Sequence, residues 1–480
     1  MAASTKSTIG LIIDSTAYQQ SVSEYLVTLH KTGQLDITQL LVISEQRGVP
    51  KRYFTKLGKL YPNTSIQRVA TRTNISEFLK NLQADFIGYI PRGATPSLQL
   101  PDIASVRFNF LAPWLPDTDF PKETAKEVPV DAVAWIASRT MIQSVLPQLN
   151  ELDNWTVLEV ALALEKSSIP FQWRAMCGSE SELPKQKSGA HVPLKANAKV
   201  LALVPHYHCE MWLHRCLCSL VTQTRPPEGI VVIDDGSGNP PVTIVEEFPS
   251  VTLLTAPSPY QAGPYRLIQQ VIADTNYDAY LFQDADDWST SDRLYKLLQA
   301  AEVSGAELVS TQELRVFEEE SKLNPVCYPL DVNAALAEKP GHPLLHPSSL
   351  VARDLVQRLG GFATGLRFGG DTEFLLRAAL VARIVNIPDY CYFRRKRAGS
   401  LTTAPDTGLD SAVRIELLKT LKNRALTNYT VCREGQQPCL EPLVKAEPIV
   451  LSHITGPQLS KKAPGQRAEG MHIDGSSFQY

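Results

Sequence analysis

The sequence predicts an α/β protein of two domains, the second being a Rossmann-like domain with a mostly parallel sheet. Three observations support this prediction. The chain has 480 residues, which is too long for one ordinary hydrophobic core. From about residue 198, short apolar segments alternate with amphipathic ones, which is typical of βαβ units. Acidic residues follow several apolar segments, where ligands of parallel sheets collect.

The second domain is expected over residues 198–427, and its elements follow from hydrophobic periodicity. Lys199–Pro205 reads as a buried strand and Glu210–Gln223 as a helix. A Ser or Asp cap opens the helix expected at 291–304. The remaining strands are expected at 229–235, 251–255 and 279–283, and the remaining helices at 265–274 and 416–426.

The first domain, expected over residues 1–177, has the same alternating pattern. Strands are predicted at 8–14, 37–44 and 84–90, and a helix at 19–30. Residues 89–102 align with 281–294, and residues 155–174 with 370–395. This alignment places Arg92, Ala94 and Thr156 where the second domain has Asp284, Asp286 and Asp371. The first domain is therefore either a degenerate duplicate that has lost its acids or an unrelated Rossmann-like domain.

Two segments lack periodicity. Residues 178–197 are polar and contain Gly, Pro and Lys, so we expect a linker. Residues 428–480 are expected to form a loosely structured tail, 463–480 most of all.

Composition limits the classes of partner and the compartment. The net charge of −3 gives no sign of nucleic-acid binding. The longest apolar stretches, such as Val157–Leu164, are too short to cross a bilayer, and the N-terminus lacks a secretory signal pattern. We therefore expect a cytoplasmic protein, with peripheral contact at the inner membrane face left open. The cysteines near His206 and His208 match no standard zinc spacing and are expected to be reduced thiols.

The strongest chemical signal is the run YLFQDADDWSTSDR at 280–293. An apolar strand ends there in three carboxylates, Asp284, Asp286 and Asp287. Carboxylates this close repel one another unless a cation offsets their charge. Hard oxygen ligands favour Mg²⁺ or Mn²⁺, and such an ion binds a diphosphate in turn.

The order of motifs from 199 to 402 resembles family 2 glycosyltransferases, inverting enzymes with the GT-A fold. The stretch VPHYHCEMWLHRCLCSLVTQT at 204–224 resembles the family's opening strand, loop and helix, which would place Pro205 and Tyr207 against the nucleotide base. The stretch VVIDDGSG at 231–238 resembles the nucleotide-binding segment, which assigns Asp234 and Asp235 to uracil or ribose contacts. The family usually has Asn at the position of His208.

Further matches imply the catalytic groups. Gly263–Arg266 resembles a Gly-x-x-Arg segment whose Arg266 approaches the nucleotide. In the acidic run, the resemblance makes Asp286 the main metal ligand, Asp284 a metal or nucleotide-sugar contact, and Asp287 a supporting metal-site residue. In RFGGDTEFLLRAA at 367–379, the general base maps to Asp371, while Gly370 replaces an acid that the family commonly has there. Glu373 is the alternative base. Its purely structural role would be to place a negative charge at the N-terminus of a helix, where the helix dipole favours it.

The resemblance also points to an acceptor side. His346 and Ser348 would border the acceptor pocket, although a turn before a helix explains them equally well. In YFRRKRAGSLT at 392–402, Arg397 replaces a His that is common in the family and is expected to pair with diphosphate. Arg394 is a further acceptor contact in this basic patch, which would suit a diphosphate or an anionic lipid-linked acceptor.

These matches predict metal-dependent transfer, with inversion, of a sugar from a nucleotide-diphosphate sugar to an acceptor hydroxyl in glycan or polysaccharide synthesis. A UDP-sugar is the first expectation for the donor, and glycan, lipid-linked and protein acceptors all stay open. The alternative is a nucleotide-sugar-binding or scaffold protein of a glycan-assembly complex without turnover, motivated by the acid missing before Asp371 and the His missing near Ser400.

Overall fold

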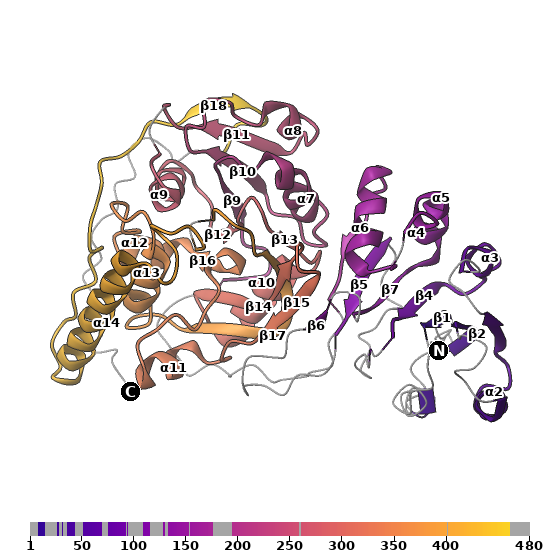
Figure 1. Ribbon diagram of the computed structural model, residues 1–480. Coiled ribbons are helices and arrows are strands. Elements are labelled where there is room, and N and C mark those ends of the chain that lie inside the picture. The colour runs from indigo at the N-terminus through magenta and orange to yellow at the C-terminus, as the bar shows by residue number, and fades with distance from the viewer. Residues whose placement is uncertain are drawn as a thin grey trace. The chain divides into compact units, whose positions relative to one another are not determined.

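A computed structural model gives the fold of the chain (Figure 1). The structure describes residues 8–14, 26–27, 31, 36–43, 51–69, 75–92, 94, 109–115, 128–129, 133–152, 154–175, 194–258, 261–400 and 402–460. Most of the helix predicted at 19–30, most of the linker and residues 463–480 lie outside these ranges. Of that predicted helix, residues 26–27 are described and are helical.

The chain divides into two compact units, in agreement with the two domains expected from its length. The first comprises residues 1–180 with 316–325, and the second 181–315 with 326–480.

The second unit contains the strands and helices that were predicted after residue 198, together with several more. Its strands are β9 (Val200–His206), β10 (Gly229–Asp234), β11 (Val251–Thr255), β12 (Ala279–Phe282), β13 (Trp288–Ser289), β14 (Leu308–Phe317), β16 (Leu350–Ala352), β17 (Ile384–Arg395) and β18 (Ser452–Thr455). Its helices are α7 (Glu210–Val221), α8 (Val242–Glu246), α9 (Pro264–Asp274), α10 (Arg293–Ser304), α11 (Val332–Glu338), the 3-10 turn η4 (His346–Ser348), α12 (Arg353–Arg358), α13 (Gly370–Ala378) and α14 (Ala412–Arg433).

The sheet of this unit has the strand order β13-β17-β14-β16-β12-β9-β10-β11-β18. Strands β11, β10, β9 and β12 run parallel to one another, and β16 is antiparallel to β12. The parallel strands are apolar and buried along almost their whole length because helices cover both faces. Right-handed crossovers place α7 and α9 on opposite sides of β9 and β10 (Figure 1).

This topology brings the predicted polar residues to one edge. The carboxyl ends of β9, β10 and β12 are Pro205–His206, Asp234 and Phe282. Since parallel strands end at the same edge, the loops that follow these three strands lie together at that edge of the sheet.

The prediction of a loosely structured tail is wrong for residues 428–460. Helix α14 continues to Arg433, and β18 pairs antiparallel with the edge strand β11. The Thr252 hydroxyl donates to the Pro457 carbonyl at 2.7 Å. Gly456 has φ +88°, and a Cβ there would lie 2.0 Å from the Val251 carbonyl oxygen. Tertiary pairing therefore orders a segment that has no periodicity of its own.

The first unit contains a smaller sheet of the same kind. Its strands are β1 (Thr8–Asp14), β2 (Asp36–Ile43), β3 (Ser65–Val69), β4 (Phe86–Ile90), β5 (Phe110–Trp114), β7 (Ala134–Ser138) and β8 (Gln172–Trp173). Its helices are α2 (Lys51–Leu60), α3 (Ile75–Lys80), α4 (Arg139–Ser144), α5 (Leu146–Leu149) and α6 (Val157–Lys166). The short strands β6 (Val128–Pro129) and β15 (Lys322–Val326) pair with each other.

The two main sheets share one connectivity. The first has the order β3-β2-β1-β4-β7-β5-β8, and the second contains β11-β10-β9-β12-β16-β14-β17. We number the strands along each unit and leave out β6, β13, β15 and β18. Both sheets then have the strand order 3-2-1-4-6-5-7. In both, three parallel pairs are followed by two antiparallel pairs. This shared order supports the hypothesis of an internal duplication.

The positions that the alignment paired with catalytic acids have other roles in the first unit. Arg92 is exposed after β4, and Ala94 is buried. Thr156 forms a capping box with Glu159 at the start of α6. These residues bring no carboxylate to the end of β4.

Candidate active site

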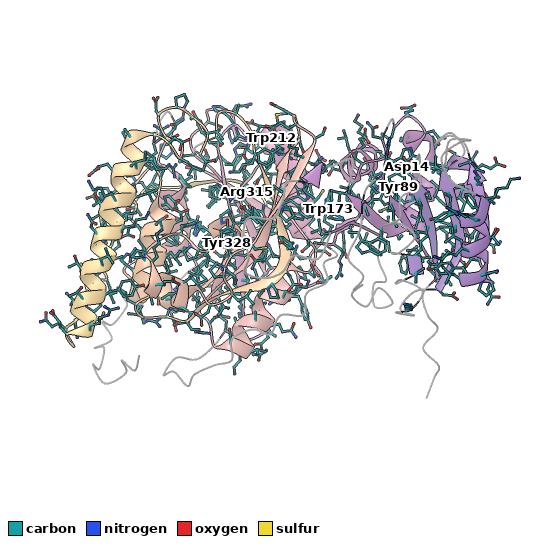
Figure 2. The ribbon with its side chains drawn as sticks, turned by 60° about the horizontal axis from the view of Figure 1, so that its bottom comes forward. Asp14, Tyr89, Trp173, Trp212, Arg315 and Tyr328 are labelled. Atoms are coloured by element: carbon teal, nitrogen blue, oxygen red, sulfur yellow. The ribbon has the colours of Figure 1, made fainter. Side chains whose placement is uncertain are left out.

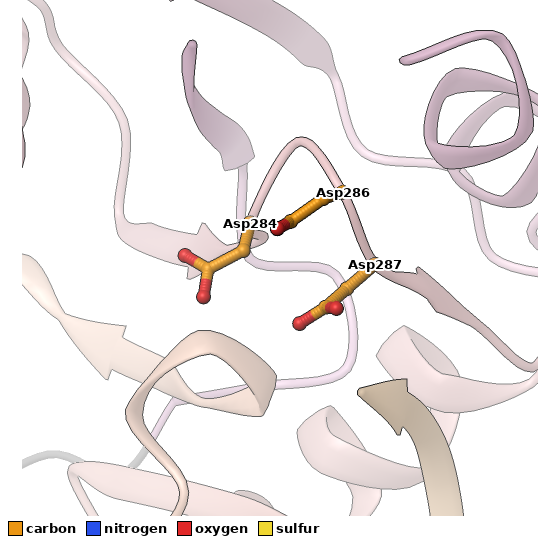
Figure 3. A group of neighbouring side chains, drawn as sticks. All are labelled: Asp284, Asp286 and Asp287. Carbon is orange, nitrogen blue, oxygen red and sulfur yellow. The ribbon is translucent and has the colours of Figure 1, made fainter. Parts of the chain in front are cut away.

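The three aspartates after β12 lie on one loop and form a compact acidic group (Figure 3). One carboxylate oxygen from each of Asp284, Asp286 and Asp287 lies within 4.8 Å of the others. The Asp287 N–H donates to the Asp284 carbonyl at 3.2 Å, and the Asp284 N–H donates to the Tyr392 hydroxyl at 3.1 Å. These bonds fix the loop, so the acids are held together by the backbone. This arrangement agrees with the predicted metal site.

Two arginines from the end of β17 offset part of this negative charge. Arg397 Nε donates to Asp286 Oδ2 at 2.7 Å, and its guanidinium lies 4.5 Å from the ring centre of Trp212. The Arg395 N–H donates to Asp287 Oδ1 at 2.7 Å, and Arg395 Nε donates to the Asp286 carbonyl. Asp287 is therefore largely committed to holding the loop, whereas Asp284 stays open to solvent.

The protonation of the group reflects its crowding. Partial desolvation by the surrounding protein and then the Asp286 carboxylate raise the pKa of Asp284 to about 7. Burial, and then the carboxylates of Asp286 and Asp284, raise the pKa of Asp287. A divalent cation would remove this repulsion, and the hard oxygen donors suit Mg²⁺ or Mn²⁺.

The ends of β9 and β10 form the expected nucleotide side. Pro205 is half-buried in β9, and Tyr207 after it has 39% of its surface exposed, available for stacking. Asp234 is fully buried. Its Oδ2 accepts from the Ser237 N–H and the Thr255 hydroxyl, and its Oδ1 lies 3.2 Å from His206 Nδ1. The predicted direct contact between Asp234 and a nucleotide is therefore not supported, because this carboxylate holds the loop.

Asp235 joins the end of β10 to the loop before α9. It accepts from the N–H groups of Ala262 at 2.6 Å and Gly263 at 2.9 Å. Arg266, one turn further, donates through Nε to the Glu447 carbonyl in the ordered tail. The structure thus brings Asp235 and the Gly263–Arg266 segment together, but a contact from Arg266 to the nucleotide stays a prediction.

Asp371 lies in the first turn of α13, where the sequence predicts the base. Its Oδ1 accepts from the Thr372 N–H at 2.8 Å, and its Oδ2 lies 3.7 Å from His342 Nε2. Burial alone would raise the pKa of Asp371, but His342, His346 and these hydrogen bonds hold it below its usual value. Asp371 is therefore ionised at neutral pH.

The missing acid before Asp371 has a steric explanation. A Cβ at Gly370 would lie 2.7 Å from the Tyr265 ring. The Tyr265 ring thus fills the space that a side chain at 370 would need, and its hydroxyl is a hydrogen-bond partner of Asp371. Where the family commonly has an acid before the base, this chain has Gly370, and Tyr265 is the neighbour of Asp371 instead.

The prediction that Glu373 is the alternative base is wrong. Its carboxylate is buried, with 2% of the residue exposed, and it is saturated by donors. Arg377 binds it through Nε and Nη2, and it also accepts from Arg424 Nη1 and the Leu443 N–H, each at 2.9 Å. No oxygen lone pair is left for a proton from an acceptor, so Glu373 anchors α13 to α14 and the tail.

Two of the three predicted acceptor residues need revision. Ser348 is fully buried and bonds the Ser310 hydroxyl at 2.6 Å, so the prediction that it borders a pocket is wrong. His346 stacks on Phe282 at 4.2 Å, and burial lowers its pKa to about 4, so it is a neutral packing residue near Asp371. Arg394 is partly exposed and lies 3.6 Å from Glu313, which leaves it available to a ligand.

Comparison with known proteins identifies this part of the chain. The model of Glycosyl transferase family 2 matches residues 202–343, which include the ends of β9 and β10 and the acidic loop. The chain contains a family 2 glycosyltransferase domain. The match ends before Asp371 and the arginines of β17. The glycosyltransferase domain has the GT-A fold, as predicted.

Solved structures align over about half of the chain. S. aureus TarS 1-349 in complex with UDP has 19% identity over 48% of this chain and 66% of that one, with a TM-score of 0.37. The mannosyltransferase PcManGT from Pyrobaculum calidifontis, in complex with GDP-Man and Mn²⁺, has 16% identity over 53% of this chain and 70% of that one, with a TM-score of 0.35. No curated protein sequence matches the chain.

Four residues of the glycosyltransferase domain were missed by the sequence reasoning, namely His206, Trp212, Tyr265 and His342. His206 and Tyr265 stand next to predicted site residues in the sequence, and Trp212 lies in the helix that follows Tyr207; these positions were the only available signal. Tyr265 is tied to the glycine at 370, and His342 is half-exposed in a loop whose relation to Asp371 appears only on folding.

Among the described residues, no helix combines the length and apolar character needed to cross a membrane.

Proposed function

We propose that the glycosyltransferase domain transfers a sugar, with inversion, from a nucleotide-diphosphate sugar to an acceptor hydroxyl. The observation that carries this proposal is the acidic loop. Three carboxylates lie within 4.8 Å of one another at the carboxyl end of a parallel sheet, in a segment that matches a glycosyltransferase family. Carboxylates this close repel one another unless a cation offsets their charge.

The acidic loop fits a divalent cation. Asp284 and Asp286 would hold Mg²⁺ or Mn²⁺, while Asp287 keeps its bond to the Arg395 N–H. When bound, the ion would offset the charge on the departing diphosphate. Arg397 already neutralises Asp286 and would be free to pair with a phosphate oxygen once the carboxylate has another partner.

The donor would lie along the ends of β9 and β10. Tyr207 is exposed at that edge and offers a ring for stacking on a base. Asp235 shapes the opposite wall through the backbone of Ala262 and Gly263. A UDP-sugar is our first choice of donor.

Asp371 would act as the general base. It is ionised, partly exposed, and oriented by the Thr372 N–H, with His342 beside its second oxygen. An ionised carboxylate at this place accepts the proton of the acceptor hydroxyl as the oxygen attacks the anomeric carbon. His342 would hold the carboxylate and not itself touch the reacting atoms.

We place this activity in glycan or polysaccharide synthesis in the cytoplasm. The acceptor would be a glycan, a lipid-linked glycan or a protein. The first unit would bind the acceptor or a partner, since the residues at the end of β4 lack the acids of the catalytic copy.

A donor screen tests the proposal. Full-length protein is incubated with Mn²⁺ and a panel of UDP- and GDP-sugars, and release of nucleoside diphosphate is measured with and without EDTA. We expect one donor to turn over with Mn²⁺, and EDTA to abolish turnover. Asp286→Asn should lose both metal-dependent nucleotide binding and turnover. Asp371→Asn should keep nucleotide binding and lose at least about 100-fold in rate.

The exposed carboxylate of Asp354 on α12 provides the matched control, and Asp354→Asn should behave like the wild type. Nucleotide binding without turnover of any donor would favour the binding-protein alternative. Native turnover in Asp371→Asn would overturn the assignment of the base.

A further inference from the structure

The basic run at the end of β17 sends its side chains to two different faces. Successive side chains of an extended strand alternate, so residues 395 and 397 share one face and residues 394 and 396 the other. The guanidiniums of Arg395 and Arg397 both lie over Trp212, at 5.6 and 4.5 Å, and both bond Asp286. They belong to the metal and diphosphate side of the cleft.

The other two cations face β14. Arg394 Nη1 lies 3.6 Å from Glu313 Oε2, and Lys396 is electrostatically coupled to Arg394, Arg315 and Glu313. Arg315 and Tyr328, which also reach this group, are labelled in Figure 2. Arg315 Nε donates to Glu313 Oε1 at 2.6 Å, and the Tyr328 hydroxyl donates to the same oxygen at 3.1 Å. We call Arg315, Arg394 and Lys396 the β14–β17 cation cluster.

The two arginines of this cluster share one ion-pair partner. That partner is Glu313, whose carboxylate is buried. Within the described chain, neither Arg394 nor Lys396 donates a hydrogen bond, and Lys396 has no ion-pair partner. Burial lowers the pKa of Lys396 to about 8, with smaller contributions from the neighbouring cations Arg394 and Arg315.

A partly buried cation without a counter-ion costs free energy, and a bound anion would lower that cost. The side chains of Arg394 and Arg315 keep 21% and 31% of their surface exposed, so the cluster is reachable from solvent. Arg394 directly precedes Arg395, whose N–H donates to Asp287 Oδ1, so the cluster lies next to the acidic loop. Because Arg395 and Arg397 face Asp286, an anion bound by the cluster would lie on the other face of the strand end and not on the diphosphate face.

We propose that Arg315, Arg394 and Lys396 form an anion-binding subsite that recognises a phosphate or carboxylate group of the acceptor. This proposal rests on the proposed function, because it takes the cleft to be a transferase site. It narrows the acceptor to an acidic glycan or a phosphate-bearing polymer. Two arginine forks with one ammonium match the geometry and charge of either oxyanion.

Binding of small anions to the full-length protein tests the subsite. Saturating UDP and Mn²⁺ are present throughout, so that the diphosphate face is already filled. Inorganic phosphate and glucuronate are titrated separately by calorimetry, which tells a phosphate-bearing from a carboxylate-bearing acceptor. We expect one of them to bind the wild type, and Lys396→Gln and Arg394→Gln to weaken it at least about tenfold. Lys396→Arg should retain binding, and Lys419→Gln, an exposed lysine of α14, is the control.

Thermal stability provides a second readout that does not depend on activity. Lys396→Gln removes an uncompensated cation, so without added anion it should melt at or above the wild-type temperature. The anion that binds should raise the melting temperature of the wild type and not that of Lys396→Gln.

The failures are distinguishable. If UDP and Mn²⁺ bind normally but neither anion binds, or if both bind Lys396→Gln as tightly as the wild type, the subsite is refuted and the proposed function stands. If Lys396→Gln loses UDP affinity instead, the cluster serves the donor and the inference is wrong. If UDP fails to bind the wild type, the proposed function is what fails.

Discussion

Replacing Glu373 by Gln separates the structural acid of α13 from the catalytic one. The wild-type carboxylate accepts from Arg377, Arg424 and the Leu443 N–H, and its side chain is 1% exposed. Glutamine keeps the shape but removes the charge, and its NH₂ group faces donors. Arg377, with 3% of its side chain exposed, would then be a buried cation without a counter-ion.

The expected cost follows from this geometry. Breaking a buried ion pair by removing one partner destabilises a protein by roughly 3–5 kcal/mol. At roughly 2 °C per kcal/mol for a unit of this size, the melting temperature of the second unit should fall by about 6–10 °C. Turnover per folded molecule should stay close to the wild type, because Glu373 has no lone pair directed to the cleft.

The assay is calorimetry of the full chain, combined with turnover measured well below the transition. Glu302→Gln, an exposed carboxylate on α10, is the matched control and should shift the transition by no more than about 1 °C. A Glu373→Gln protein that melts like the wild type but no longer transfers sugar would refute the reasoning and restore Glu373 as the base.

Two further predictions concern charge and backbone. Lys396 is protonated below its pKa of about 8 and loses its charge above it, so the KM for an acidic acceptor should be flat below pH 7 and rise above pH 8. Lys396→Arg, which stays charged, should remove this rise, and identical profiles for the two proteins would contradict the prediction. Gly456→Ala should destabilise the second unit by roughly 1–3 kcal/mol, because φ is +88° and the added Cβ meets the Val251 carbonyl. Gly435→Ala has a similar φ of +72° but open surroundings, so equal losses of melting temperature in the two variants would show that the β18 contact is unimportant.

The parallel core was predictable from the sequence because its signals are local. The strand expected at 251–255 has those bounds as β11, and the helix expected at 265–274 differs from α9 by one residue. An apolar run between turn residues specifies a buried strand without reference to the rest of the chain. The acids after β12 were also readable, since three carboxylates in four residues can hardly avoid one another.

The roles of individual side chains depended on distant contacts. Asp371 and Glu373 are two residues apart in the same helical turn, and nothing local shows which one faces the cleft. Packing of α13 against α14 and the tail decides it, because Arg424 and Leu443 come from those segments. Ser348 and Asp234 likewise have partners, Ser310 and Thr255, that lie more than 20 residues away.

The sequence by itself determined the βαβ order, the place of the acidic loop and the family of the domain. The tertiary structure decided which of the predicted residues are buried anchors and that residues 428–460 are ordered by pairing with β11. It also decided that Arg394 shares the buried Glu313 with Arg315, and that Lys396 has no ion-pair partner among the described residues. The physical reason is that periodicity and turn chemistry act over a few residues. Burial and charge balance are instead set by segments that meet only when the chain folds.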